Sequence, residues 1–314
     1  MGQLVSGVWT KSSVSNNQKD GSFKRVDSVF RNEISVNGQV YKPETNRYHL
    51  YVSYACPWAH RTLIFRHLKK LENHISVDYV HPDMLENGWS FLKDFPKTTG
   101  DSLYGKKYIH EIYQISDKNV SSKATVPILW DKKTDTIVNN ESAEIIRIMN
   151  SAFNDITKNY DDYYPSNLRI EIDKINKVIY ENINNGVYKS GFSRTQEAYE
   201  DAVTKLFSSL EMIDEILEDK EYLVGNVLTE ADIRLIPTLL RFDSVYYVHF
   251  KCNLKKINEF KNISSYVKRM FNIPAINTTT NFDHIKRHYY YSHEHINPYS
   301  CLLYTSDAAD EVSW

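Results

Sequence analysis

The apolar positions of the chain follow two different spacings, which divide it into a first part with strands and a second part of helices. Short runs of β-forming residues at positions 48–53, 75–80 and 125–130 predict three strands. Between the first two runs, apolar residues every three or four positions predict a helix that begins near Pro57. The order strand, helix, strand is the unit of a parallel sheet.

The predicted sheet resumes after a stretch without sustained spacing. Residues 81–122 are interpreted as irregular, because Pro, Gly and polar residues interrupt every short apolar run. Ile137 and Val138 follow the third strand after a polar turn, which predicts a hairpin. Glu141 and Ser142 then open a predicted helix. The first domain is therefore expected to be α/β.

Nearly all apolar residues beyond position 166 recur at helical spacing, which predicts an all-α second domain. One of its helices has a clear start, because Asp232 follows Thr229 by three residues in the pattern of a capping box. Another helix is expected to be interrupted at Gly186.

These patterns set the predicted domain boundaries. Residues 1–46 are polar and turn-rich, and they are interpreted as an N-terminal arm. The α/β domain covers residues 47–152 and, after a polar linker, the all-α domain covers residues 166–299. Residues 301–314 resemble the translation of a sequencing-library adapter, so they are set apart from the fold.

The charge balance and the start of the chain narrow the classes of partner. The 38 Lys and Arg residues nearly balance the 40 Asp and Glu residues, so no basic field favours nucleic acid or an anionic membrane. No apolar run approaches the ~20 residues that a membrane span needs, and the first residues lack the pattern of a secretory signal. The three cysteines form an odd, sparse set that favours a reducing compartment. A cytoplasmic protein is therefore expected.

One cysteine lies where a thiol becomes reactive. Cys56 follows the first predicted strand and precedes Pro57, and proline is favoured in the first turn of a helix. Cys56 is then the N-cap residue, where free backbone N–H groups and the helix dipole stabilise a thiolate. Ala59 occupies the third position after it, so a second thiol would come from another molecule. The alternative is a buried structural cysteine, the commoner fate of this residue type.

Several short strings in a fixed order carry a family resemblance. The strings CPWAHR at 56–61, TVP at 125–127 and ES at 141–142 resemble a glutathione transferase. The strings NGWSF at 87–91, NNGVY at 184–188 and IKRHYY at 285–290 resemble its Xi class, the glutathionyl-hydroquinone reductases. The resemblance implies a thioredoxin-like N-terminal domain, a helical C-terminal domain, a homodimer and glutathione as co-substrate. It also implies reduction of S-glutathionyl-hydroquinones through a mixed disulfide of Cys56 with glutathione.

The resemblance assigns a set of residues to glutathione binding. The set is Trp89, Lys123, Ala124, Thr125, Val126, Glu141 and Ser142. Val126 precedes a proline that is cis in this superfamily, which exposes the Val126 backbone for pairing with the tripeptide. Glu141 is expected to accept from the γ-glutamyl ammonium, and Ser142 with its helix to hold the α-carboxylate. Lys123 stands where the family often has Arg, so it keeps the charge but lacks the bidentate fork.

The resemblance also assigns a catalytic set, which is Cys56, Tyr188, Tyr246 and Tyr289. Tyr188 would donate a proton to the departing phenolate, since a phenol matches a hydroquinone oxygen in basicity. Tyr246 and Tyr289 would line the pocket for the aromatic substrate. Tyr290 adjoins Tyr289, so the register of this residue is open by one position.

Other functions compete with this prediction. One is an omega-like thioltransferase or dehydroascorbate reductase that uses the same cysteine. Another is a non-catalytic glutathione-binding or regulatory protein on the same fold. A metal site is weighed as well, because His284 and His288 are four residues apart, with His293 and His295 close behind. The H-E-x-x-H pattern is absent, so no metal is expected.

Overall fold

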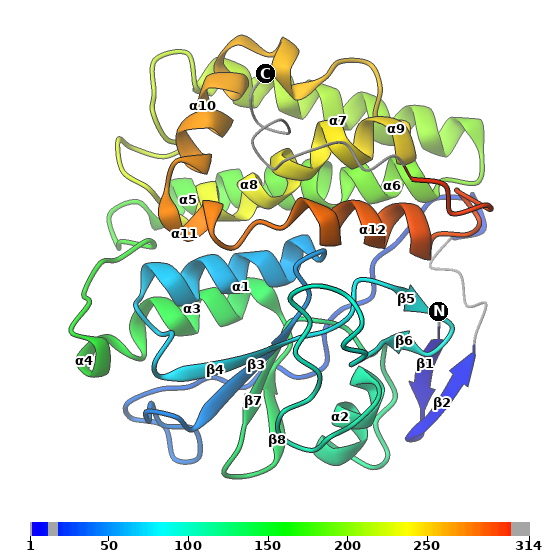
Figure 1. Ribbon diagram of the computed structural model, residues 1–314. Coiled ribbons are helices and arrows are strands. Elements are labelled where there is room, and N and C mark those ends of the chain that lie inside the picture. The colour runs from blue at the N-terminus through cyan, green and yellow to red at the C-terminus, as the bar shows by residue number, and fades with distance from the viewer. Residues whose placement is uncertain (1, 12–17, 303–314) are drawn as a thin grey trace. The chain divides into compact units, whose positions relative to one another are not determined.

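The chain divides into two compact units in the computed structural model (Figure 1). The structure describes residues 2–11 and 18–302. Of these, residues 2–11 and 27–161 form the first unit, and residues 18–26 and 162–302 form the second. The predicted N-terminal arm therefore contributes to both units. Most of the predicted adapter-like tail, residues 303–314, lies outside the described residues.

The first unit is built on a four-stranded mixed sheet. In spatial order its strands are β4 (Ile75–Tyr79), β3 (Tyr48–Val52), β7 (Ile128–Asp131) and β8 (Thr136–Asn139). β3 runs parallel to β4, and the other two neighbouring pairs are antiparallel. All five residues of β3 are buried, as expected for a central strand that is covered on both faces. The predicted strands and the predicted hairpin are confirmed.

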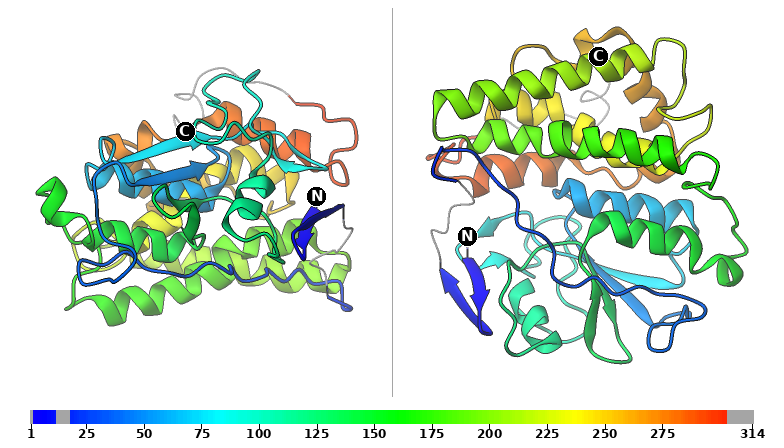
Figure 2. Two further views of the ribbon diagram at one scale, coloured as in Figure 1. Left: turned by 90° about the horizontal axis from the view of Figure 1, so that it is seen from below. Right: turned by 180° about the vertical axis from the view of Figure 1, so that it is seen from behind.

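Two helices lie together along one face of this sheet (Figures 1 and 2). Helix α1 (Pro57–Leu68) connects the parallel strands, and it packs against α3 (Ser142–Ser151). The first unit also contains the short helix α4 (Asn154–Thr157) and a hairpin of β1 (Gly2–Val5) and β2 (Val8–Lys11). The hairpin is tied to the rest of the unit, because Leu4 and Ser122 exchange backbone hydrogen bonds.

The interpretation of residues 81–122 as irregular was wrong in part. This stretch contains a small hairpin, β5 (Met84–Leu85) with β6 (Gly88–Trp89), and the helix α2 (Ile109–Ser116). The helix buries Ile109, Ile112 and Tyr113, which are spaced by three and one positions on one face. Eight residues are too few to give a sustained period, so the helix depends on its contacts with β6 and β8 rather than on a pattern visible in the sequence.

The described elements of the second unit are all helical, as predicted. In chain order they are α5 (Arg169–Val178), η1 (Ile179–Asn184), α6 (Gly186–Phe192), α7 (Gln196–Ile216), α8 (Glu230–Arg241), η2 (Phe242–Tyr246), α9 (Tyr247–His249), η3 (Ile257–Glu259), α10 (Lys261–Phe271), α11 (Pro274–Asn277) and α12 (Phe282–Ser292). The predicted capping box at the start of α8 is present, since the Thr229 N–H donates to the Asp232 carboxylate at 2.9 Å. None of the helices that the structure describes is long and apolar enough to cross a membrane.

The expected interruption at Gly186 takes another form. The chain stays helical from α5 to α6, but it passes through the π-helical segment η1, and Asn185 keeps right-handed helical angles. The Asn185 N–H donates to the Tyr180 carbonyl five residues earlier, which is the π-helical spacing. A Cβ at Gly186 would lie 3.5 Å from the Leu206 side chain, an ordinary contact, so the glycine neither ends the helix nor needs special angles.

Candidate active site

Cys56 occupies the predicted N-cap position. It lies between β3 and α1 in an extended conformation, Pro57 follows in the first turn, and no acidic residue occurs in that turn. The residue is about nine-tenths buried, and its thiol donates to the Val126 carbonyl at a sulfur–oxygen distance of 3.5 Å. The positive end of α1 and the absence of a nearby acid in the helix favour the thiolate form, which is the nucleophilic form of cysteine.

The segment that faces Cys56 carries the expected cis peptide bond, between Val126 and Pro127. Val126 is buried, Lys123 and Ala124 are half-buried, and Thr125 is exposed. The structure therefore brings one member of the predicted glutathione set, Val126, into direct contact with the predicted nucleophile.

A tyrosine that sequence reasoning missed holds this segment in place. The hydroxyl of Tyr113, on α2, donates to the Thr125 carbonyl at 3.1 Å and accepts from the Thr125 N–H at 3.2 Å. The Tyr113 hydroxyl also accepts from the side-chain amide of Asn140, the residue directly before Glu141, at 2.9 Å. Tyr113 is fully buried, and burial raises the pKa of its hydroxyl, so the group stays protonated and able to donate. Its partners lie 12 and 27 residues away, so no local pattern could have revealed the role.

Glu141 and Ser142 lie at the N-terminus of α3. The Glu141 carboxylate accepts from the Ala143 N–H at 3.1 Å and from the Ser28 hydroxyl at 3.2 Å. These two bonds leave acceptor capacity, since a carboxylate has about four lone-pair sites. Ser142 is buried, and its hydroxyl accepts from the Arg61 guanidinium at 3.4 Å. An ammonium and a carboxylate of one ligand could therefore both be held at this helix start.

Trp89 lies on β6 and is almost fully buried. The β1–β2 hairpin supports the turn before it, because a Cβ at Gly88 would lie 3.3 Å from the Trp9 ring and the φ of Gly88 is +74°. The Trp9 ring in turn stacks on His110 at 4.4 Å between ring centroids. The hairpin thus fixes the loop that carries Trp89.

The three predicted tyrosines of the second unit form a chain of hydroxyl groups. The Tyr289 hydroxyl lies 2.6 Å from that of Tyr188 and 2.9 Å from that of Tyr246. Tyr246 and Tyr289 are fully buried, and burial raises the pKa of both well above the ordinary value. Tyr188 is half-buried, so it is the member of the cluster that can meet a ligand. Because each hydroxyl can both donate and accept, a proton can be transferred between Tyr188 and the two tyrosines linked to it.

Three consecutive tyrosines lie at the C-terminal end of α12. The Tyr290 hydroxyl donates to the Ser244 carbonyl at 3.1 Å, and the Tyr291 ring lies under the Arg287 guanidinium at 3.6 Å. The hydroxyl of Tyr289 lies within hydrogen-bond distance of those of Tyr188 and Tyr246.

Comparisons with known proteins agree with both units. Residues 55–152 match the family model described as glutathione S-transferase, N-terminal domain, and residues 196–269 match the model of the C-terminal domain. The glutathionyl-hydroquinone reductase YqjG of Escherichia coli is 50% identical over 305 residues, which cover 95% of this chain and 93% of that protein. The glutathione S-transferase Xi of Phanerochaete chrysosporium is 48% identical with a TM-score of 0.90, covering 93% of this chain and 95% of that one. This chain belongs to the Xi class of the glutathione transferase family. The solved structure of YqjG with bound glutathione is also similar, with a TM-score of 0.88, 48% identity, and coverage of 96% of this chain and 94% of that one.

In this Xi-class chain, the C-terminal histidines form a packed cluster. His249, which sequence reasoning missed, lies 3.1 Å from His293 between ring nitrogens, and the two rings are stacked. Burial, with the neighbouring His288 and His295, lowers the pKa of His249 to about 4 and that of His293 well below its ordinary value. Within residues 2–11 and 18–302, no group of three or more His, Cys, Asp or Glu residues is placed to hold a metal ion.

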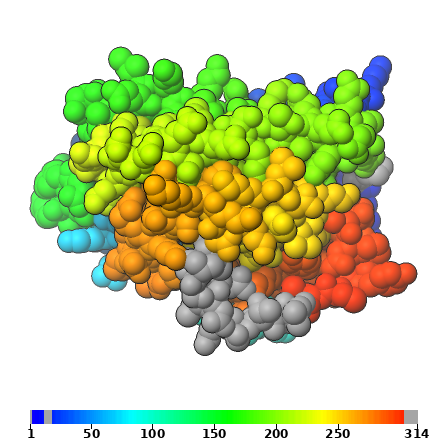
Figure 3. Space-filling model, turned by 90° about the horizontal axis from the view of Figure 1, so that it is seen from above, coloured from blue at the N-terminus to red at the C-terminus, as the bar shows by residue number. Residues whose placement is uncertain are grey.

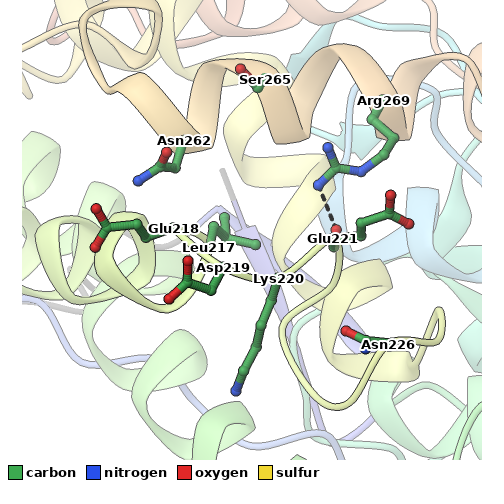
Figure 4. Close-up of a pocket in the computed structure, with 9 residues that line it drawn as sticks. All are labelled: Leu217, Glu218, Asp219, Lys220, Glu221, Asn226, Asn262, Ser265 and Arg269. Atoms are coloured by element: carbon green, nitrogen blue, oxygen red, sulfur yellow. Dashed lines mark hydrogen bonds between the residues drawn. The ribbon is translucent and has the colours of Figure 1, made fainter.

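The second unit has a polar hollow whose lining contains none of the predicted site residues. Its volume is about 640 Å³. It is lined by Leu217, Glu218, Asp219, Lys220, Glu221, Asn226, Asn262, Ser265 and Arg269 (Figure 4). These residues come from the end of α7, the loop after it and α10, helices that lie on the face drawn in Figure 3. The lining contains charged and amide groups and no aromatic ring, so the hollow does not suit an aromatic substrate of this transferase.

Proposed function

We propose that this protein reduces S-glutathionyl-hydroquinones to hydroquinones, with glutathione as co-substrate. The observation that carries the proposal is the single thiol at the start of α1, which lies against the Val126 carbonyl and has alanine three positions later. Such a thiol can form a mixed disulfide with glutathione, and a second molecule must resolve it. The similarity to the glutathionyl-hydroquinone reductase YqjG supports this choice of substrate.

Glutathione would bind to the first unit through a small number of groups. The Val126 backbone would pair with the tripeptide beside Cys56. Glu141 would accept from the ammonium group, and Ser142 at the N-terminus of α3 would bind the α-carboxylate. Trp89, Lys123, Ala124 and Thr125 complete the proposed set.

The proposed reaction has two displacement steps at sulfur. The Cys56 thiolate attacks the glutathione sulfur of the substrate, a sulfur–sulfur bond forms, and the carbon–sulfur bond breaks. The electron pair of that bond leaves with the hydroquinone, and Tyr188 supplies the proton that neutralises the leaving group. A second glutathione thiolate then attacks the mixed disulfide, which releases oxidised glutathione and restores the Cys56 thiolate. Tyr246 and Tyr289 would hold the Tyr188 hydroxyl and bound the aromatic group.

The test is turnover of a glutathionyl-hydroquinone with glutathione by the wild type and by Cys56→Ala. We expect hydroquinone release with ping-pong kinetics from the wild type and none above background from the variant. Cys252→Ala is the matched control, because burial raises the pKa of the Cys252 thiol and keeps it unreactive. Mass analysis should find glutathione on Cys56 when the second glutathione is withheld.

The outcomes separate the competing functions. Turnover of small glutathionyl disulfides alone would assign the protein as an omega-like thioltransferase or dehydroascorbate reductase. Glutathione binding without any thiol-dependent turnover would assign a non-catalytic role. Tyr188→Phe should lose hydroquinone release by about 10²- to 10⁴-fold and keep reaction with small disulfides, because only the first reaction needs a proton to replace the broken carbon–sulfur bond.

The assembly and location belong to the same proposal. We propose a homodimer in the cytoplasm, with small molecules as the partners of the site. Sedimentation of the full chain would test the oligomeric state, and a monomer at working concentration would refute it.

A further inference from the structure

A short N-terminal segment, residues 18–26, belongs to the second unit although 135 residues separate it from the rest of that unit. Its first part is held at the residues that follow α6. The Arg194 N–H donates to the Gly21 carbonyl, and the Thr195 hydroxyl donates to the Asp20 carbonyl, both at 3.0 Å. Gly21 has a φ of +84°, and a Cβ there would lie 2.8 Å from the Thr195 methyl group, so this close approach requires glycine.

The same segment contacts both ends of α6. Phe23 packs on Phe192, the last residue of that helix, with 5.3 Å between ring centroids. Arg25 donates from Nε to the side-chain oxygen of Asn185, directly before the helix, at 2.7 Å. The 18–26 segment therefore spans the seven-residue helix that carries Tyr188.

Arg25 also contacts Tyr188 itself. The guanidinium carbon lies 4.9 Å from the centroid of the Tyr188 ring. A cation over an aromatic face is attracted by the ring, and it stabilises negative charge that develops on the ring when the phenol loses its proton. At the other end of the ring, the Tyr188 oxygen lies 2.6 Å from the Tyr289 hydroxyl, which can donate to it.

The remaining titratable groups around the cluster do not duplicate this arrangement. Tyr246 of η2 and Tyr289 of α12 are buried phenols, and burial raises the pKa of both. The charge of Arg241, at the end of α8, partly opposes this rise in the pKa of the two buried tyrosines. His249, His288 and His293 contact the Tyr289 ring edge-on, and burial lowers the pKa of His249 and His293, which favours their neutral form.

We propose that Arg25 is a positioning residue for Tyr188, which holds its ring and favours release of its proton to the leaving group. This inference rests on the proposed function, because it assumes that Tyr188 is the proton donor. It adds a role for the 18–26 segment and a basic residue that neither predicted set contains. A segment that only stabilises the fold would need the Phe23 and Gly21 contacts but not a cation over the ring.

The experiment compares Arg25→Met with Arg25→Lys, which keeps the charge but not the planar guanidinium. Lys24→Met is the matched control, because it removes an exposed charge from the neighbouring position. For Arg25→Met we expect a fall in kcat of roughly threefold to thirtyfold, from the usual strength of a cation–π contact. The alkaline limb of the pH profile should move up by roughly half a unit to one and a half units. The KM for glutathione should not change, Arg25→Lys should recover part of kcat, and Lys24→Met should match the wild type.

A second readout does not depend on turnover. The alkaline titration of the phenolate absorption band, taken as the difference between the wild type and Tyr188→Phe, reports on the Tyr188 hydroxyl and on its effect on the tyrosines that it contacts. The same difference, measured in the Arg25→Met background, should titrate at higher pH. If both differences titrate together, the proposal for Arg25 is overturned, whatever the substrate is. If they differ while the wild type releases no hydroquinone, the proposed function fails and the effect of Arg25 on Tyr188 stands.

Discussion

The three linked tyrosines of the second unit are expected to make unequal contributions, because the two short hydroxyl contacts both belong to Tyr289. The Tyr289 hydroxyl lies 2.6 Å from that of Tyr188 and 2.9 Å from that of Tyr246, and Tyr246 also interacts with Tyr188. We therefore predict that Tyr289→Phe destabilises the protein more than Tyr246→Phe does. Both changes remove one oxygen from a fully buried ring and leave its packing in place.

The size of the difference follows from the number of hydrogen bonds. A typical buried hydrogen bond contributes about 1 kcal/mol net, and a buried hydroxyl left without a partner costs about 1–3 kcal/mol. Tyr289→Phe removes both the 2.6 Å and the 2.9 Å contact, so we expect a loss of about 2–3 kcal/mol. Tyr246→Phe removes the 2.9 Å contact and leaves Tyr289 paired with Tyr188, so we expect a loss of about 1 kcal/mol.

Urea unfolding of the full-length protein, followed by fluorescence and by circular dichroism, measures these differences. Tyr299→Phe serves as the control, because that side chain is 88% exposed and its hydroxyl lies in water. Equal losses for Tyr289→Phe and Tyr246→Phe would refute the predicted inequality. Losses no larger than that of Tyr299→Phe would refute the idea that the linked hydroxyl groups stabilise the unit. Turnover adds a second check, since Tyr289→Phe should also lower kcat for hydroquinone release more than Tyr246→Phe.

Three further predictions concern other groups. Asp131→Asn should destabilise the first unit by about 2–3 kcal/mol in urea unfolding, because the buried Arg47 donates to both Asp131 oxygens at 2.8 and 2.7 Å and would keep only Glu44 as a carboxylate partner. A loss below that of an exposed pair such as Lys205→Ala would contradict this. The free energy of unfolding should fall as the pH drops from about 6.5 towards 4, because burial lowers the pKa of His249 and the unfolded chain binds a proton there that the folded chain does not. The contribution of His249 to this fall reaches about 3 kcal/mol. An equally steep fall in His249→Gln would argue against this origin. Lys123→Arg should lower the KM for glutathione without changing kcat, because a guanidinium can bind a carboxylate with two hydrogen bonds. An unchanged or raised KM in steady-state kinetics would show that Lys123 does not face a carboxylate of glutathione.

The parts of the fold that were predictable are those governed by short-range rules. A β-rich run followed by Cys56 and Pro57 defines a strand, an N-cap and a helix start within a few residues, and the structure has all three. The capping box of Thr229 and Asp232 depends on two residues three positions apart. Helix α2 was missed because it is short and gains its stability from contacts with β6 and β8. For the site residues, the family resemblance selected tyrosines that spacing alone could not have chosen.

Local sequence therefore determined where the thiol lies and which elements surround it, because N-caps, strands and capping boxes are set by neighbouring residues. Tertiary structure decided which side chains act together. It joined Tyr188 to Tyr289 across 101 positions, left Tyr290 bonded elsewhere, and placed Arg25 of the N-terminal segment over the Tyr188 ring. It also made Tyr113 the support of the Thr125 segment and paired His249 with His293. These contacts join residues that are distant in the chain and meet only when helices pack, so no periodicity along the sequence encodes them.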